Sequence, residues 1–297
     1  MKIGLITSDD YANFQYDIYK SLQAVGADVI AYKLARHIFS YENQCEVILP
    51  NQITEKYKDC DVVILIHSCW QLLEFLPDKL VIPFHTGTPY RSNPSMVNSK
   101  FNAPFTLIAL PEFKTLAPNP KYLVGAVELD LPVKPVGERL VIGHFPSNPS
   151  VKGTHDINRI IWQLKDSYDF EYLHSTDRVS HAENLARMNA CDIYVELMAP
   201  TQGGKPYGSF GISGLEAGAL GKVVVTQSLS NDLYYETYNQ LFFSNIRGER
   251  DLKGLLEWFL TNPDKVTEIQ ATTKELIKRN HSYKATGEKL MGYLNGL

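Results

Sequence analysis

The sequence predicts two doubly wound α/β domains, each built on a parallel sheet. Short apolar runs alternate with helically spaced segments along the whole chain, a pattern typical of βαβ units. The alternation breaks at Leu131–Arg139, a segment with two prolines and a glycine that predicts a linker, and then starts again. A length of 297 residues is enough for about two domains. The alternative that the same pattern allows is a single large sheet.

The first domain is predicted to span residues 1–136. Its first strand begins almost at the first residue, and the helix that follows keeps its apolar spacing up to Gly26, a residue type that stops helices. Three further apolar runs have the length of buried strands. The predicted elements are the strands Lys2–Thr7, Asp28–Tyr32, Asp61–His67 and Leu80–Phe84 and the helix Phe14–Val25.

The second domain is predicted to span residues 137–297. Its tail from Asp251 is helical apart from a turn at Asn262-Pro263, and the last helix is expected to cross back to the first domain. Ligands are expected outside the carboxyl ends of the strands. The predicted elements are the strands Leu140–His144, Glu171–His174, Asp192–Leu197 and Lys222–Thr226 and the helices His155–Lys165, Ala182–Asn189 and Ile212–Leu220.

Composition and charge narrow the class of protein. The formal net charge is −4 and the sequence pI about 6.1. Nucleic-acid-binding proteins usually carry a strongly basic domain, so this charge argues against that class. The four cysteines form no CxxC pair, so we expect reduced thiols in a cytoplasmic protein. Two aspartates interrupt the first ten residues before a signal peptide could form, and no apolar run approaches the ~18 residues of a membrane span.

The first segment that carries chemistry is Val141–Gly153, VIGHFPSNPSVKG. A buried strand leads into a polar turn at Ser147 and Asn148, and Lys152-Gly153 then opens a helix. A cation beside the free amides of a helix N-terminus is a natural site for a diphosphate. The alternative interpretation is a surface lysine at a turn.

The second segment is Gly203–Val225, GGKPYGSFGISGLEAGALGKVVV. Its glycines let the backbone approach a ligand, and the amides around Ser209–Ile212 precede a helix that carries Glu216. Glycine-rich turns before a helix favour phosphate. A carboxylate one to two turns further along can accept hydrogen bonds from vicinal ribose hydroxyls. Either feature alone is a weak signal, but two anion-binding features in one domain indicate a nucleotide site.

These segments resemble the nucleotide-binding domain of retaining glycosyltransferases with the GT-B fold, in the large glycosyltransferase family 4. The matching residues are VIGHFPSNPSVKGT, CDIYVELM, YGSFG and GLEAGALGKVVV. The likeness covers roughly Leu140 to Leu290. It extends weakly to Ile82–Arg91, where IPFHTGTPYR looks like the histidine-glycine loop of the family's N-terminal domain.

The resemblance implies two Rossmann-like domains facing an interdomain cleft, with a nucleotide-sugar donor held by the second domain. Lys152 would hold the donor diphosphate, Glu216 the ribose, and His85 would lie near the transferred sugar. Lys152 and His85 are therefore the expected catalytic residues. The expected donor-binding residues are Ser147, Asn148, Lys152, Gly153, Tyr207, Gly208, Ser209, Phe210, Gly211 and Glu216.

The sequence departs from the family pattern at three places. Gly208 stands where the E-x7-E pattern has its first glutamate, and Ser147 stands where an arginine commonly precedes the lysine. Lys205 and Arg159 are candidates for the second positive charge. Ser8-Asp9-Asp10-Tyr11 replaces the glycine-rich turn after the first strand. These departures bear on the identity of the sugar and on activity itself.

The expected function is transfer of a sugar from a nucleoside diphosphate sugar to an acceptor hydroxyl, with retention, without a metal ion and without a cofactor. With no DxD-like cluster after a strand, Lys152 and helix dipoles would stabilise the leaving diphosphate. The alternatives are a nucleotide-sugar epimerase or hydrolase on the same fold, and a non-catalytic nucleotide-sugar-binding protein.

The acceptor is not specified by the sequence, and a saccharide, a lipid-linked sugar and a modified nucleic acid all remain open. Asp9, Asp10 and Arg91 are candidate acceptor residues. For the two aspartates, capping of the following helix is the favoured interpretation. Arg91 lies in a polar stretch that either touches a phosphate-bearing acceptor or is a solvated loop. His67, at the end of its strand, is interpreted as structural.

Overall fold

A computed structural model describes residues 1–297 apart from Asp130, Val133, Gly203 and Leu229. The chain forms two compact units: residues 1–126 with 281–297, and residues 127–280. Val133 of the predicted linker and Gly203 of the glycine-rich segment therefore lie outside the described residues, and the side chain of Lys205 is not described either. Within the described residues, no helix is long and apolar enough to cross a lipid bilayer.

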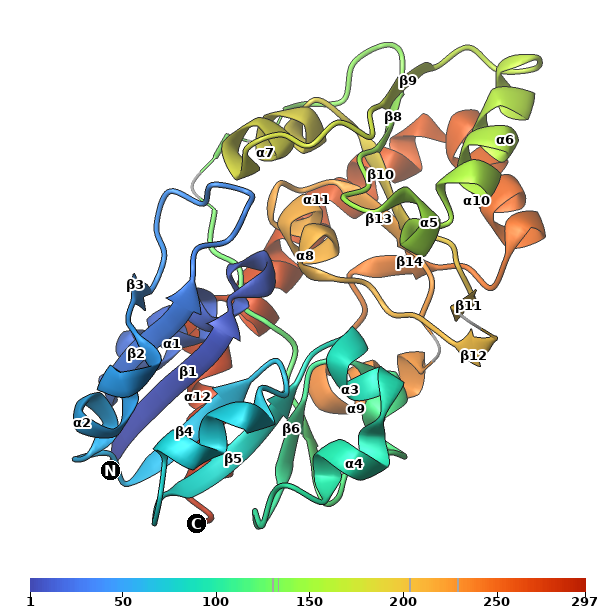
Figure 1. Cartoon of the computed structure of the whole chain (residues 1–297). Helices are drawn as coiled ribbons and strands as arrows, with labels where there is room; N and C mark the ends of the chain where they lie inside the picture. Colours follow the sequence, from blue (N-terminus) through green and yellow to red (C-terminus); the bar gives the residue numbers. More distant parts are fainter. Residues whose placement is uncertain (130, 133, 203, 229) are drawn as a thin grey trace. The chain divides into compact units, whose positions relative to one another are not determined.

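The first unit is built on a seven-stranded sheet whose order is β3-β2-β1-β4-β5-β6-β7, with every neighbouring pair parallel. The chain starts in the middle and builds the sheet outward in both directions (Figure 1). Ile6, Val63 and Leu65 pack one face of the central strands into a buried apolar cluster. The strands are β1 Lys2–Asp9, β2 Asp28–Ala35, β3 Glu46–Val47, β4 Val62–Ile66, β5 Leu80–His85, β6 Thr106–Ile108 and β7 Pro120–Tyr122.

Helix α12 (Tyr283–Leu294), at the end of the chain, packs against α1 (Phe14–Ala24) within this first unit (Figure 1). Gly287 allows the close approach, because a Cβ atom there would lie 2.1 Å from the carbonyl oxygen of Ser21. The Tyr283 hydroxyl donates to Asp17 Oδ1 at 3.1 Å and ties the start of α12 to α1. The other helices of this unit are α2 Ile53–Tyr57, α3 Thr88–Ser92 and α4 Pro94–Asn98, with 3-10 turns at Tyr11–Asn13, Pro50–Gln52, Trp70–Phe75 and Pro111–Phe113.

The second unit is built on a five-stranded parallel sheet whose order is β14-β13-β10-β8-β9. Two short strands of two residues each, β11 and β12, pair antiparallel in the segment that connects β10 to α8. The strands are β8 Val141–His144, β9 Glu171–His174, β10 Ile193–Leu197, β11 Thr201–Gln202, β12 Lys205–Pro206, β13 Val223–Thr226 and β14 Phe243–Asn245. The helices are α5 Pro149–Lys152, α6 Thr154–Lys165, α7 His181–Asn189, α8 Ile212–Ala219, α9 Asn231–Tyr238, α10 Glu249–Thr261 and α11 Pro263–His281.

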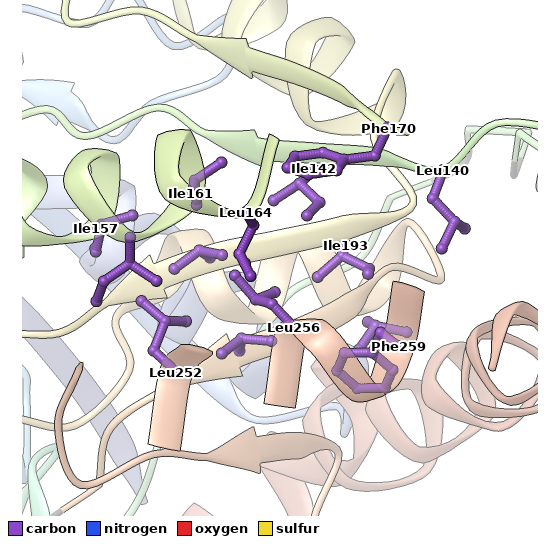
Figure 2. Close-up of a cluster of buried hydrophobic side chains, with 14 of the residues drawn as sticks. Leu140, Ile142, Ile157, Ile161, Leu164, Phe170, Ile193, Leu252, Leu256 and Phe259 are labelled. Atoms are coloured by element: carbon purple, nitrogen blue, oxygen red, sulfur yellow. The ribbon is translucent and has the colours of Figure 1, made fainter. Parts of the chain in front are cut away.

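The core of the second unit lies between one face of this sheet and the helices α6 and α10 (Figure 2). Alternate residues of the strands face this core, as in Ile193 and Val195 of β10, because side chains alternate across a strand. Ile161 of α6 and Leu256 of α10 meet them from the helix side. This packing fixes the strands whose carboxyl ends carry the candidate site.

Candidate functional site

The switch point of the second sheet lies between β8 and β10. From β8 the chain first moves to β9 on one side and then returns to β10 on the other. In open parallel sheets such a reversal leaves a crevice outside the carboxyl ends of the two strands, and ligands bind there. Lys152 follows β8, and Glu196 lies near the end of β10.

His144, the last residue of β8, fixes the turn that leads to Lys152. Its Nδ1 lies 2.8 Å from the carbonyl oxygen of Val195, and its Nε2 lies 2.9 Å from Thr154 Oγ1 at the start of α6. A carbonyl oxygen can only accept, so Nδ1 donates to it and Nε2 accepts from the threonine hydroxyl. Burial lowers the pKa of His144 to about 4, which keeps the ring neutral. The ring therefore ties β8, β10 and α6 together.

Gly153 allows the backbone to turn directly after Lys152. Its φ is +72°, in the left-handed region that favours glycine, and a Cβ atom there would lie 1.8 Å from the carbonyl oxygen of Met198. The Met198 N–H donates to the Lys152 carbonyl at 3.1 Å and joins the turn to the end of β10. These contacts hold the Lys152 backbone at the switch point.

The Lys152 ammonium forms an ion pair with the buried carboxylate of Glu196. The Gly211 N–H and the Ser213 hydroxyl, at the start of α8, each donate to the same Glu196 Oε1 at 3.1 Å. A Cβ atom at Gly211 would lie 3.8 Å from Lys152 Nζ. The structure thus brings Lys152 and Gly211, predicted from separate motifs, to one point.

The pKa of Glu196 reflects these contacts. Burial by itself raises the pKa of this carboxyl, but the Lys152 ammonium and the donated hydrogen bonds outweigh it and hold the pKa below its usual value. Glu196 is therefore a carboxylate at neutral pH. The sequence prediction did not include this residue.

The loop before α8 has a structural reason for glycine at position 208. Gly208 has a φ of +126°, and a Cβ atom there would lie 1.9 Å from Gln227 Nε2. That amide donates to the carbonyl oxygens of Tyr207 and Ala199, at 2.5 and 2.8 Å, and so joins the loop to the end of β13. Phe210 anchors the other side of the loop against Tyr234, Phe242 and Phe243. A glutamate cannot take position 208 without displacing Gln227.

Glu216 lies on α8 and is almost fully buried. Its Oε1 accepts a hydrogen bond at 2.5 Å from Nε2 of His181, the first residue of α7. Glu216 is one of the predicted site residues, and His181 is not among them. A histidine directly before a predicted helix carries no signal by itself, since its partner comes from a distant part of the chain.

The remaining predicted donor residues differ in their exposure. Ser147 and Asn148 are exposed, and Asn148 Oδ1 accepts from the Ser150 hydroxyl at 2.9 Å. Tyr207 is half-buried, and Ser209 is buried. Arg159, a candidate for a second positive charge, forms exposed ion pairs with Glu249 at 2.6 Å and Asp156 at 3.4 Å.

In the first unit, His85 is fully buried at the end of β5. Its ring stacks on Tyr90 with centroids 3.8 Å apart and planes 7° from parallel, and its Nδ1 lies 2.7 Å from the Ser68 hydroxyl. Its Nε2 has no hydrogen-bond partner among the described residues. Burial lowers the pKa of His85 to about 3, so the ring is neutral at physiological pH.

The loops after β1 and β4 hold the other candidates of the first unit. Asp10 is buried and caps α1, accepting from the N–H groups of Gln15 at 2.6 Å and Tyr16 at 3.2 Å, as the favoured interpretation expected. His67 contacts Thr86 through Nδ1 and lies 3.9 Å from Asp10 Oδ1 through Nε2. His67 and Ser68 both have a positive φ, 60° and 61°, a strained conformation that clusters at functional sites.

Asp9 and Arg91 differ in their surroundings. Asp9 is exposed at the end of β1. Arg91 is largely buried and donates to Glu112 Oε1 at 2.7 Å, with its guanidinium 5.3 Å from the centre of the Phe113 ring. The Arg91 charge is therefore balanced inside the unit, whereas the Asp9 carboxylate faces solvent.

The two parallel sheets fit two Rossmann-like domains, and the chain shares the GT-B fold of the solved structures that it resembles. The chain is similar over 100% of both lengths to HepE of Anabaena in a complex with UDP-glucose, at 13% identity and a TM-score of 0.70. It is similar to a glycosyltransferase from Rickettsia africae at 12% identity, 99% and 98% coverage and a TM-score of 0.68. It is also similar to an alpha-glucosyltransferase solved with UDP and a 13-mer DNA containing an HMU base, at 10% identity, 99% coverage of each chain and a TM-score of 0.60. No family model matches the sequence, and no curated protein does.

Proposed function

We propose that this protein is a glycosyltransferase that moves a sugar from a nucleoside diphosphate sugar to an acceptor hydroxyl. One observation carries the proposal: the Lys152 ammonium and the first turn of α8 meet at the switch point of the second unit. The GT-B fold supports it, and two proteins of similar structure, HepE and an alpha-glucosyltransferase, were solved with UDP or UDP-glucose. A uridine nucleotide is therefore the first donor to test.

In the proposed reaction, the bond between the anomeric carbon and the β-phosphate oxygen breaks, and the acceptor oxygen bonds to the same carbon. The first N–H groups of an α-helix have no hydrogen-bond partner within the helix. Lys152 and the first-turn amides of α8 stabilise the charge on the leaving diphosphate. Transfer proceeds with retention, and the β-phosphate oxygen takes the proton of the acceptor. The protein then supplies positive charge from Lys152, without a metal ion or another cofactor.

The other residues position the substrates. Glu216 accepts hydrogen bonds from the ribose hydroxyls, with His181 holding the carboxylate. We propose that His85, whose ring is neutral, contacts the transferred sugar. Asp9 is the strongest of the three acceptor candidates, because Asp10 and Arg91 already have partners in their own unit. The free thiols Cys45, Cys60, Cys69 and Cys191 fit a cytoplasmic location.

A panel of nucleoside diphosphates, measured by thermal stability, tests the donor site. UDP at a hundredfold excess over its Kd is expected to stabilise the protein by about 2.7 kcal/mol. Glu216→Gln removes the ribose-binding charge and should reduce the affinity for UDP. Glu183→Gln, an exposed glutamate of α7 paired with Arg187, is the matched control and should leave the affinity unchanged. If no nucleotide of the panel raises the thermal stability, the proposal is contradicted.

The same experiments separate the two alternatives. Because Gly208 stands at the position of the family's first glutamate and its loop is held by Gln227, a binding protein without turnover is the alternative that an observation favours. UDP binding without consumption of UDP-glucose, across a broad acceptor panel, would identify that case. Consumption of UDP-glucose without any acceptor would identify a hydrolase or an epimerase.

A further inference from the structure

The carboxylate of Glu196 occupies the point at which the proposed donor site offers its positive charge. Glu196 is 1% exposed, and its Oε1 contacts Lys152 Nζ, the Gly211 N–H and the Ser213 hydroxyl. Its Oε2 accepts from the Thr226 hydroxyl at 2.8 Å. An ammonium, a backbone amide and a hydroxyl converging on one oxygen are the contacts that proteins give to phosphate oxygens.

Packing does not explain a carboxylate at this position. Glu196 lies in β10 among the buried apolar residues Val195 and Leu197. Removing a carboxylate from water is costly, and a well-packed apolar side chain is often as stable as a buried ion pair. The charge therefore acts on its partners, of which Lys152 is the one assigned to the donor diphosphate.

We propose that Glu196 is a positioning residue that competes with the donor diphosphate for Lys152 and sets how tightly nucleotide is held. Glu196 holds the ammonium beside the start of α8. When a diphosphate binds, it shares an ammonium whose charge is already balanced, so the gain in binding free energy is smaller. The nucleoside diphosphate product then leaves faster. This inference rests on the proposed function.

Glu196→Gln isolates the charge of this residue. The amide oxygen can accept from Lys152, Gly211 and Ser213, while the amide NH₂ faces Thr226, whose hydroxyl can also accept. The variant keeps the shape and the hydrogen bonds but raises the local net charge by one. We expect UDP to bind at least about tenfold more tightly, because a buried unpaired charge attracts an anion more strongly than a paired one.

The test is titration calorimetry with UDP, combined with stopped-flow measurement of UDP release. The expected results for Glu196→Gln are a lower Kd, a slower release rate and, in the transfer reaction, a lower KM for UDP-glucose together with a lower kcat. Glu196→Asp keeps the charge but withdraws it from Lys152, so it should change the Kd in the same direction by less. Glu183→Gln should change none of these values.

The possible outcomes separate this inference from the function on which it rests. If the wild-type protein binds no nucleoside diphosphate, the proposed function and this inference both fail. The thermal unfolding transition of each Glu196 variant shows whether the variant is folded. If the wild type binds UDP and a folded Glu196 variant binds UDP equally or more weakly, Glu196 has a structural role only. The inference is then wrong, and the proposed function stands.

Discussion

Replacing Lys152 with alanine is expected to reduce the rate of sugar transfer by about 10²–10³-fold, the usual effect of removing one group that stabilises transition-state charge. The affinity for UDP should fall as well, because the ammonium is the positive charge at the switch point. Lys253→Ala, an exposed lysine of α10 that lies 4.0 Å from Glu257, is the control. Initial rates with UDP-glucose measure the effect, and an unchanged rate would contradict the assignment.

Lys152→Ala also leaves the Glu196 carboxylate buried without its counterion, which typically costs about 3–5 kcal/mol of stability. The double variant Lys152→Ala with Glu196→Gln removes both charges and should recover most of that stability. It should not recover the rate of transfer. A double variant with near wild-type activity would mean that Lys152 supports the fold only.

Gly153→Ala is expected to destabilise the protein by about 3 kcal/mol. A non-glycine residue in the left-handed region costs roughly 1–2 kcal/mol, and overpacking costs about 1–3 kcal/mol. The added Cβ atom would meet the Met198 carbonyl oxygen at 1.8 Å and push the Lys152 turn away from β10. UDP affinity should therefore fall together with the thermal midpoint.

Gly254→Ala in α10 is the matched control for this substitution, because a Cβ atom there has nothing within 4 Å. Alanine is the better helix former, so this variant should be stabilised by up to about 1 kcal/mol. Calorimetric unfolding of both variants measures the difference. Equal midpoints for Gly153→Ala and Gly254→Ala would contradict the role given to the turn.

The long buried strands were predictable because parallel strands between two helical layers are continuous apolar runs. The predicted strands end too early where a polar residue is buried because of a contact with another part of the chain. The strand predicted to end at Tyr32 continues to Ala35, since Lys33 is buried and donates to Gln44 Oε1 at 2.6 Å. Strands such as β3 and β6 are too short to show a period, and only their neighbours in the sheet define them.

The candidate site was predictable where the backbone is constrained locally. Lys152, Gly211 and Glu216 were predicted from turns and glycines that precede helices. Glu196 was missed, although a single charged residue inside the apolar run IYVEL was a signal that could have been used. The partner of Arg91 was not predictable, because Glu112 reaches it only through the folding of the intervening loop.

A crystal structure of the protein with UDP would show whether Lys152 and the start of α8 hold the diphosphate. We expect the diphosphate to lie within hydrogen-bonding distance of Lys152 Nζ and the first-turn amides of α8, with the ribose hydroxyls on the carboxylate of Glu216. UDP bound elsewhere in the second unit, with the Lys152–Glu196 pair and the Glu216–His181 pair unchanged, would contradict it.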